Sequence, residues 1–175
     1  MRVEIDWSGQ MYFCDCDQRP PSAKLLYIKP IPWLIAKQFV ELHHYLHYAP
    51  PGSKICLGVF YQEHFLGVLI FGRPIARLED QLETLELSRM VLLDICPKNS
   101  ESRSLGLAAR WIKKKMPWVR RLISYADPGQ GHTGTIYRAA GWNFVRKTSK
   151  GRWTRRGRLR RDTAVGVKFK FEKLL

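Results

Sequence analysis

The chain has 175 residues, of which 45% are hydrophobic and 12% aromatic; this excludes a disordered chain and is typical of one folded domain. Its 30 lysines and arginines outnumber 15 acidic residues, so the formal net charge of +15 favours a polyanionic partner, nucleic acid before a membrane surface. No apolar run is long enough to span a membrane and the N-terminus lacks the apolar core of a signal peptide, so we expect a cytoplasmic protein.

The N-terminal part of the chain begins without clear periodicity. Residues 1–24 contain two consecutive prolines and indicate an irregular arm or a short hairpin, followed by a first strand at 25–28. Apolar residues at helical spacing then predict a helix over 33–47, which a Pro-Pro-Gly sequence ends. We therefore expect an N-terminal arm, 1–24, ahead of a single domain, 25–175.

The middle of the chain is rich in predicted strands. Apolar runs at 55–61 and 65–71, separated by Gln-Glu-His, predict a hairpin, and a third run at 85–93 predicts another strand. Polar residues at 97–100 then offer caps for a second amphipathic helix, whose apolar positions run from 105 to 116.

The last third of the chain alternates strands and helices. A strand at 122–126 leads through a glycine-rich loop to a helix at 135–140, which Gly141 ends, and then to a strand at 142–146. Strict alternation of apolar and polar residues at 165–172 predicts a half-buried strand. The order of strand, helix, three strands, helix, strand, helix and two strands predicts an α+β fold, a mixed sheet with helices packed on it.

The four cysteines, Cys14, Cys16, Cys56 and Cys96, include only one closely spaced pair. A zinc site needs two further ligands at a useful spacing, and the sequence has no second close pair. We therefore interpret the cysteines as reduced thiols without a special role.

A six-residue segment that follows the third long strand has the composition of a phosphate-binding helix start. The first N–H groups of a helix are unpaired and favour negative charge, a glycine lets a phosphate approach the backbone, and an arginine adds donors. The pattern indicates a pyrophosphate cradle, and an ordinary helix start is the alternative. The residues are Arg103, Ser104, Leu105, Gly106, Leu107 and Ala108.

This Arg-x-x-Gly-x-Ala pattern resembles the acyl-CoA pyrophosphate loop of the GNAT superfamily of N-acyltransferases, whose element order the chain also matches. The resemblance implies a splayed central sheet, with the thioester of acetyl-CoA or a related acyl-CoA between strands 85–93 and 122–126. Tyr137 stands in a Tyr-x-x-x-Gly-aromatic sequence, as does the family tyrosine that can protonate the leaving thiolate. The alternative for Tyr137 is a core aromatic with a satisfied hydroxyl.

Three further motifs, together with His44-Tyr45, resemble the Mom family of bacteriophage DNA-modification proteins over roughly residues 40–147. The motifs are Glu-Leu-Ser-Arg at 86–89, Ser-Tyr-Ala-Asp-Pro at 124–128 and Gly-His-Thr-Gly-Thr-Ile-Tyr at 131–137. Membership implies a transferase that converts the N6 amino group of adenine in double-stranded DNA to a carbamoylmethyl derivative and so protects phage DNA from host restriction. Membership also implies that the protein is located in the cytoplasm of a bacterial host that is infected by or carries a phage.

The implied product is not that of simple acyl transfer. A carbamoylmethyl group is joined through its methylene carbon, whereas acyl transfer to an amine gives an amide. The donor is then not a simple acetyl thioester, or a rearrangement or a metal-assisted step intervenes. A metal ion such as iron is compatible with the resemblance, but the sequence identifies no ligands for one.

The exocyclic amine of adenine is a poor nucleophile because its lone pair is delocalised into the ring. Asp127 directly follows a predicted strand and is expected to accept the hydrogen bond of this amine or remove its proton, with Tyr125 near the acyl group or the base. The alternative is that Asp127 caps the turn that follows it.

The strand at 85–93 carries further candidates. Its alternation predicts that Glu86 and Ser88 share one face and that Arg89 takes the other. Glu86 is expected to orient substrate, with a core salt bridge as the alternative. His44 and Tyr45 are catalytic candidates only through the family resemblance.

Other histidines are weaker candidates. His132 is a minor candidate for contacting phosphate or substrate. His43 and His47 are expected on one helix face at four-residue spacing, which suits a metal, but we favour polar residues beside a buried face.

Residues 146–161 hold nine lysines and arginines and no acidic residue, and are expected to form a loop or an extended hairpin tip between the last two strands. Such a charge run repels itself unless a polyanion is present. Arginine contacts phosphate in forks and a tryptophan can stack on an unpaired base, so we predict a DNA-binding segment. Its candidate residues are Arg152, Trp153, Arg155, Arg156, Arg158, Arg160 and Arg161.

Two other functions stay open. One is a GNAT acyltransferase that acts on a protein, a tRNA or a small amine, and the other is a non-enzymatic nucleic-acid-binding protein on the same scaffold. Modification of adenine in a duplex would in addition require the base to be flipped out of the stack.

Overall fold

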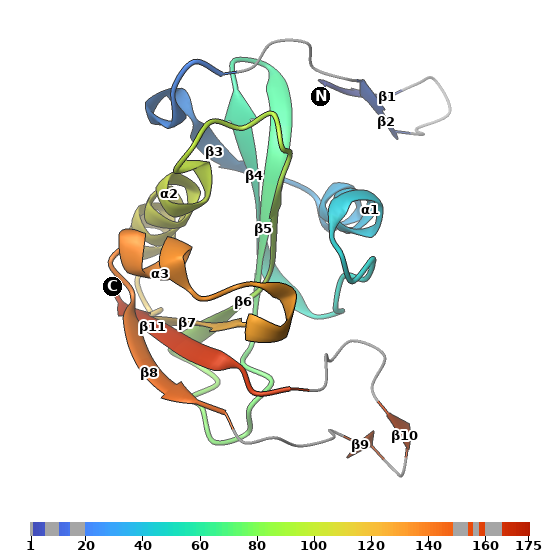
Figure 1. Ribbon diagram of the computed structural model, residues 1–175. Helices are drawn as coiled ribbons and strands as arrows, with labels where there is room; N and C mark the ends of the chain where they lie inside the picture. The colour runs from blue at the N-terminus through green and yellow to red at the C-terminus, as the bar shows by residue number, and fades with distance from the viewer. Residues whose placement is uncertain (1, 6–10, 15–19, 149–153, 156–157, 160–165) are drawn as a thin grey trace.

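The computed structural model describes residues 2–5, 11–14, 20–148, 154–155, 158–159 and 166–175. Within these residues seven strands form the main sheet, in the order β3-β4-β5-β6-β7-β11-β8 (Figure 1). Its strands are β3 (Tyr27–Pro30), β4 (Ser53–Tyr61), β5 (His64–Gly72), β6 (Thr84–Leu92), β7 (Arg121–Ala126), β8 (Asn143–Lys147) and β11 (Phe169–Leu174). The paired neighbours are antiparallel except β6 and β7, which are parallel.

Helices lie on both faces of this sheet (Figure 1). On one face α1 packs Phe39 and Val40 against Phe65 and Ile70 of β5. On the other face α2 and α3 cover a core cluster that includes Phe171 of β11. The helices are α1 (Trp33–His43), α2 (Ser100–Lys115) and α3 (Thr135–Ala139), with short 3-10 turns η1 (Ala23–Leu25) and η2 (Pro128–Gln130). The predicted α+β fold and the predicted order of elements are confirmed.

Two small hairpins form separate two-stranded sheets. In the N-terminal arm β1 (Arg2–Ile5) pairs with β2 (Met11–Cys14), which is the hairpin alternative that the sequence left open. Between β8 and β11 the two-residue strands β9 (Thr154–Arg155) and β10 (Arg158–Leu159) pair antiparallel, as expected for an extended hairpin tip.

The main sheet splits between its two parallel strands. β6 and β7 are paired only from Thr84 opposite Arg121 to Leu87 opposite Ser124. Beyond these pairs β6 continues beside β5 to Leu92, and β7 continues beside β11 to Ala126. The expected splay between these strands is therefore present and opens after Leu87 and Ser124.

The first helix is shorter than predicted. It ends at His43, because His44 adopts an extended backbone (φ −89°, ψ 136°) while its N–H still bonds to the Val40 carbonyl. The prediction that His43 and His47 share a helix face is wrong, because His47 lies beyond the helix with φ of 45°. Two buried groups, the His44 side chain and Ala49, hold the segment that follows the helix.

A register shift on β6 corrects a second prediction. Phe71 pairs with Leu87 and the neighbouring Ile70 pairs with Arg89, so Ser88 is an extra residue on β6. Such a bulge reverses the alternation of side chains beyond it. Glu86 and Arg89 therefore lie on the same face, not on opposite faces as the alternation predicted.

The final strand also departs from the prediction. It starts at Phe169 rather than at 165, and Lys170, expected to face solvent, is only 4% exposed. The Lys170 ammonium pairs with the Glu79 carboxylate from the loop between β5 and β6. The prediction failed because that loop covers a sheet face which the local alternation marks as polar.

Candidate functional site

A buried hydrogen-bond chain lies at the last pair before the sheet splits. The Ser124 hydroxyl donates to the Leu87 carbonyl at 3.3 Å and lies 2.8 Å from the Tyr137 hydroxyl. In the contact between Ser124 and Tyr137 either hydroxyl can be the donor. Ser124 opens the Ser-Tyr-Ala-Asp-Pro motif at 124–128, but the sequence assigned it no role of its own.

Tyr137 sits at the centre of an aromatic cluster on α3. Its ring stacks on Phe171 at 5.1 Å between centroids and lies 5.5 Å from the Trp142 ring. Burial raises the pKa of Tyr137, so the phenol stays protonated and can act as a proton donor. Both alternatives for this residue are compatible with its place: a core aromatic with a satisfied hydroxyl, and an acid beside the split.

Asp127 ends β7 and is buried. Its Oδ1 accepts the N–H of Gly129 at 3.0 Å, so the predicted capping role is real. Its Oδ2 is also buried and has no hydrogen-bond partner among the described residues. An unpaired buried carboxylate oxygen is costly to a fold, which makes it a candidate for binding an external donor.

Three aromatic side chains gather around this carboxylate. Tyr45 stacks on His44 at 4.4 Å between ring centroids and lies 5.9 Å from His132. Burial first, and then the negative charge of Asp127, raise the pKa of Tyr45. The structure thus brings together four residues from two separate segments, the residues after α1 and the loop after β7.

His44 is held in its neutral form. Its Nδ1 accepts the N–H of Leu46 at 3.1 Å. Burial, and then the positive charge of Arg89, lower the pKa of His44 from 6.5 to about 4. Arg89 links β6 to the same segment, because its Nε donates to the Tyr48 carbonyl at 2.8 Å.

This neutral histidine makes stability depend on pH. The depressed pKa contributes stability that is fully present above pH 6.5 and is lost as the pH falls through about 4. We expect the free energy of unfolding of the wild type to fall more steeply between these values than that of His44→Asn, whose side chain can still accept from Leu46 but does not titrate. Urea denaturation at a series of pH values measures both, and parallel curves would contradict the neutral His44.

The other β6 candidates take part in structural contacts. The Ser88 hydroxyl donates to the Ile70 carbonyl at 3.0 Å, across the bulge. The buried Glu86 accepts the N–H of Ile75 at 2.9 Å, and burial raises its pKa. This bond takes the place of the ion pair considered for Glu86. Burial, followed by the charges of Glu86 and Glu79, raises the pKa of Tyr125 to about 12. Tyr125 pairs in the sheet with Lys170, which binds Glu79 of the loop between β5 and β6.

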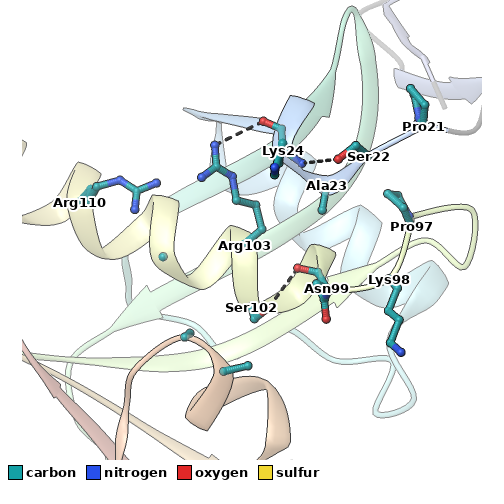
Figure 2. Close-up of a pocket in the computed structure, with 13 residues that line it drawn as sticks. Pro21, Ser22, Ala23, Lys24, Pro97, Lys98, Asn99, Ser102, Arg103 and Arg110 are labelled. Carbon is teal, nitrogen blue, oxygen red and sulfur yellow. Dashed lines mark hydrogen bonds between the residues drawn. The ribbon is translucent and has the colours of Figure 1, made fainter.

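A second candidate site is a groove of about 650 Å³ along α2 (Figure 2). The side chain of Arg103 extends from α2 to η1, where its Nη2 donates to the Lys24 carbonyl at 3.4 Å. The groove walls combine cations with small residues from η1, α2 and α3. They include Ser22, Lys24, Lys98, Asn99, Ser102, Arg103, Gly106, Arg110 and Ala140.

The predicted pyrophosphate segment needs a correction. Helix α2 begins at Ser100, so Arg103 to Ala108 lie within its first turns and do not start it. Ser104, Leu105 and Ala108 are buried against the core, whereas Arg103 and Gly106 line the groove. Arg110 joins them, and its position seven residues after Arg103, on the same helix face, is the signal that could have found it.

Gly106 leaves its side of the groove open. A Cβ added there would meet only Nη1 of Arg110, at 3.7 Å. The packing of the protein therefore does not require a glycine at this helix position, where glycine costs about 1 kcal/mol relative to alanine.

The remaining sequence predictions concern metals and nucleic acid. Among the described residues, no three His, Cys, Asp or Glu side chains group as a metal site. Arg155 and Arg158 face each other in the β9–β10 register. The other predicted DNA-binding residues, Arg152, Trp153, Arg156, Arg160 and Arg161, lie outside the described residues, as does Cys16. In the described part of the chain no helix is long and apolar enough to cross a membrane.

Comparison with known proteins gives two kinds of similarity. The model of the Mom protein family matches residues 25–171. The methylcarbamoylase Mom of Escherichia phage Mu is 31% identical over 131 residues, which cover 70% of this chain and 54% of the phage Mu protein. The chain thus spans about half the length of this curated relative.

Solved structures of acetyltransferases share the fold. A Bacillus subtilis acetyltransferase in complex with CoA has a TM-score of 0.57 at 12% identity, covering 86% of this chain and 99% of its own. An aminoglycoside acetyltransferase in complex with coenzyme A and kanamycin has a TM-score of 0.62 at 8% identity, covering 85% and 94%. A GNAT family acetyltransferase from Elizabethkingia anophelis with acetyl-CoA bound has a TM-score of 0.53 at 14% identity, covering 86% and 99%. The expected GNAT-like fold is confirmed.

Proposed function

Because the chain belongs to the Mom protein family, we propose that it converts the N6 amino group of adenine in double-stranded DNA to a carbamoylmethyl derivative. The modified DNA would resist restriction enzymes that read unmodified adenine. The formal net charge of +15 supports a polyanionic substrate. Neither the donor of the transferred group nor a need for metal follows from the residues of the site.

The observation that carries this proposal is the free Oδ2 of Asp127. The N6 amine has two protons, and a carboxylate oxygen that accepts one of them increases the nucleophilicity of the nitrogen. Oδ1 is already occupied by Gly129, which fixes the orientation of the carboxylate. Tyr45 and His132 lie around the same point and are suited to contact a flipped base by stacking.

The groove along α2 is proposed to hold the pyrophosphate of an acyl-CoA. Arg103, Lys98 and Arg110 supply cations around it, and Gly106 leaves space for phosphate oxygens. A bound acyl-CoA would supply the group that is transferred, although displacement of the thiolate at the acyl carbon does not by itself form a product joined through a methylene carbon. We assign to the Tyr137 phenol, which burial keeps protonated and which lies 2.8 Å from the Ser124 hydroxyl, the donation of a proton at the start of the split.

Mass spectrometry of DNA from bacteria that express the protein tests the function. We expect deoxyadenosine to gain the mass of one carbamoylmethyl group, and expression of Asp127→Asn provides the matched control. Unmodified DNA together with newly acylated protein or tRNA would favour a general GNAT acyltransferase instead. If neither DNA nor another acceptor changes, the protein is a nucleic-acid-binding protein without this activity.

The cofactor proposal makes a separate prediction. Gly106→Glu is expected to weaken acyl-CoA binding at least about 100-fold, because the new carboxylate fills the groove, repels phosphate and can pair with Arg110 one turn later. Calorimetric titration with CoA measures the change. Gly106→Ala is the matched control and should raise stability by about 1 kcal/mol, since the extra methyl fits the fold. If folded Gly106→Glu binds CoA with unchanged affinity, the pyrophosphate of CoA does not bind in this groove.

A further inference from the structure

The loop between β5 and β6, residues 73–83, presents large apolar side chains to solvent. Leu78 is 99% exposed and Leu82 is 79% exposed, the highest values among the large hydrophobic residues that the structure describes. Ile75 in the same loop is half exposed. Isolated exposed leucines are common, but two nearly bare ones in one short loop are a feature that requires a reason.

The loop is held firmly at both sides of Leu78. The Glu79 carboxylate binds the buried Lys170 ammonium of β11 and, at 2.8 Å, the guanidinium of Arg121 on β7. On the other side the Ile75 N–H donates to the buried Glu86 carboxylate at 2.9 Å. Leu78 thus projects from a base that is attached to three strands of the sheet.

Hydrogen bonds within the loop fix its shape as well. The Asp80 Oδ1 accepts the N–H groups of Leu82, at 2.8 Å, and Glu83, at 2.6 Å. The Gln81 amide donates to the carbonyls of Ala76 and Glu79. A loop restrained in this way can press a side chain into a partner without first losing conformational freedom.

The position of the loop relates it to the proposed DNA site. Tyr125 pairs in the sheet with Lys170, whose ammonium binds Glu79, so the loop lies over the sheet face that carries Tyr125 near the split. Lys170, which Glu79 binds, pairs in the sheet with Arg146 at the base of the basic segment. Figure 1 shows the loop next to the end of β8, where that segment begins.

Charges of both signs lie in the loop around Leu78. Arg73 and Arg77 stand beside Glu79, which Lys170 and Arg121 neutralise, and beside Asp80 and Glu83. The excess of positive charge belongs to the chain as a whole, at +15, and to the basic segment that follows β8; an apolar tip near that segment suits duplex DNA, a polyanion with stacked bases in its interior. A second copy of this chain is a poorer partner, because two chains of net charge +15 repel each other.

We propose that Leu78 is a wedge that enters the base stack of duplex DNA beside the target adenine and occupies the space that the flipped base leaves. This inference rests on the proposed function. Apolar wedges unstack base steps in other DNA-binding proteins, and enzymes that modify a base must take it out of the stack. Leu78 is a positioning residue, since it acts on the base stack and not on the reacting atoms.

The test compares two duplex oligonucleotides that contain one adenine modified by the wild type. In one the adenine pairs with thymine, and in the other it faces an abasic site and leaves the stack easily. Leu78→Ala is expected to lower the modification rate about tenfold on the paired adenine, with little change opposite the abasic site. Leu78→Phe should retain the rate on both, because it keeps a large apolar tip.

Leu34→Ala is the matched control, since Leu34 is an exposed leucine at the start of α1, and it should behave as the wild type. An equal loss by Leu78→Ala on both duplexes would overturn the wedge, as would no loss on either. A wild-type dimer in sedimentation that Leu78→Ala turns into a monomer would overturn it too. If the wild type modifies no adenine in any DNA, the proposed function itself fails, and the wedge fails with it.

Discussion

Replacing Asp127 with asparagine is expected to slow adenine modification by about 10²-fold to 10⁴-fold, the usual effect of losing a general base. The variant should fold normally, because the asparagine Oδ1 can still accept the N–H of Gly129. The amide nitrogen that replaces Oδ2 would offer hydrogen to an amine that is itself a donor. Affinity for DNA should be unchanged, since phosphate contacts lie elsewhere.

Quantification of modified deoxyadenosine over time, with purified protein or in expressing cells, measures this loss. Asp94→Asn is the matched control, because Asp94 is an exposed carboxylate outside the site and should be replaceable without effect. Near-normal modification by Asp127→Asn would leave Asp127 with its capping role alone. The functional assignment would then need another base.

The second large effect concerns the basic segment. Replacing five of its arginines with serine should weaken DNA binding by about 10³-fold or more at low salt and flatten the salt dependence by up to about 0.9 for each phosphate that the variant no longer neutralises. All sequences should be affected alike, because phosphate contacts position a protein without reading bases. The five residues are Arg155, Arg156, Arg158, Arg160 and Arg161.

Fluorescence anisotropy over a salt series gives the slope. A triple replacement of Lys113, Lys114 and Lys115 with serine removes exposed positive charge from the end of α2 and serves as the control. The control should change the slope little if DNA lies along the basic segment. An unchanged slope in the five-arginine variant would place the DNA on another surface.

Hydrophobic spacing predicted most of the fold because the strands and helices of this chain bury continuous apolar runs. The paired strands β4 and β5 are apolar along most of their length, and α2 repeats its apolar positions regularly. The exceptions arise from long-range contacts. Lys170 is buried because Glu79, 91 residues earlier, neutralises it, and no local pattern reports such a partner.

The candidate site was predictable to a different degree. Asp127, Tyr137, His44 and Tyr45 were found through motif resemblance, and the structure brings them around the split and the loop after β7. The contacts of Ser124 with Leu87 and Tyr137 could not be predicted, because they join residues far apart in the chain. The bulge at Ser88 could not be predicted either, because a register shift depends on how β5 and β6 meet. The polar caps at 97–100 agree with the start of α2, but the phosphate-binding pattern at 103–108, which indicated a helix start, lies one turn later.

The strand order also determines when the site can exist during synthesis. β11 lies between β7 and β8 although it is made after both, so β8 has no partner in the sheet until β11 leaves the ribosome. Phe171 of β11 supports the Tyr137 ring, and Lys170 holds the loop that carries Leu78. A chain in which β11 has not yet joined the sheet therefore lacks both of these supports of the candidate site.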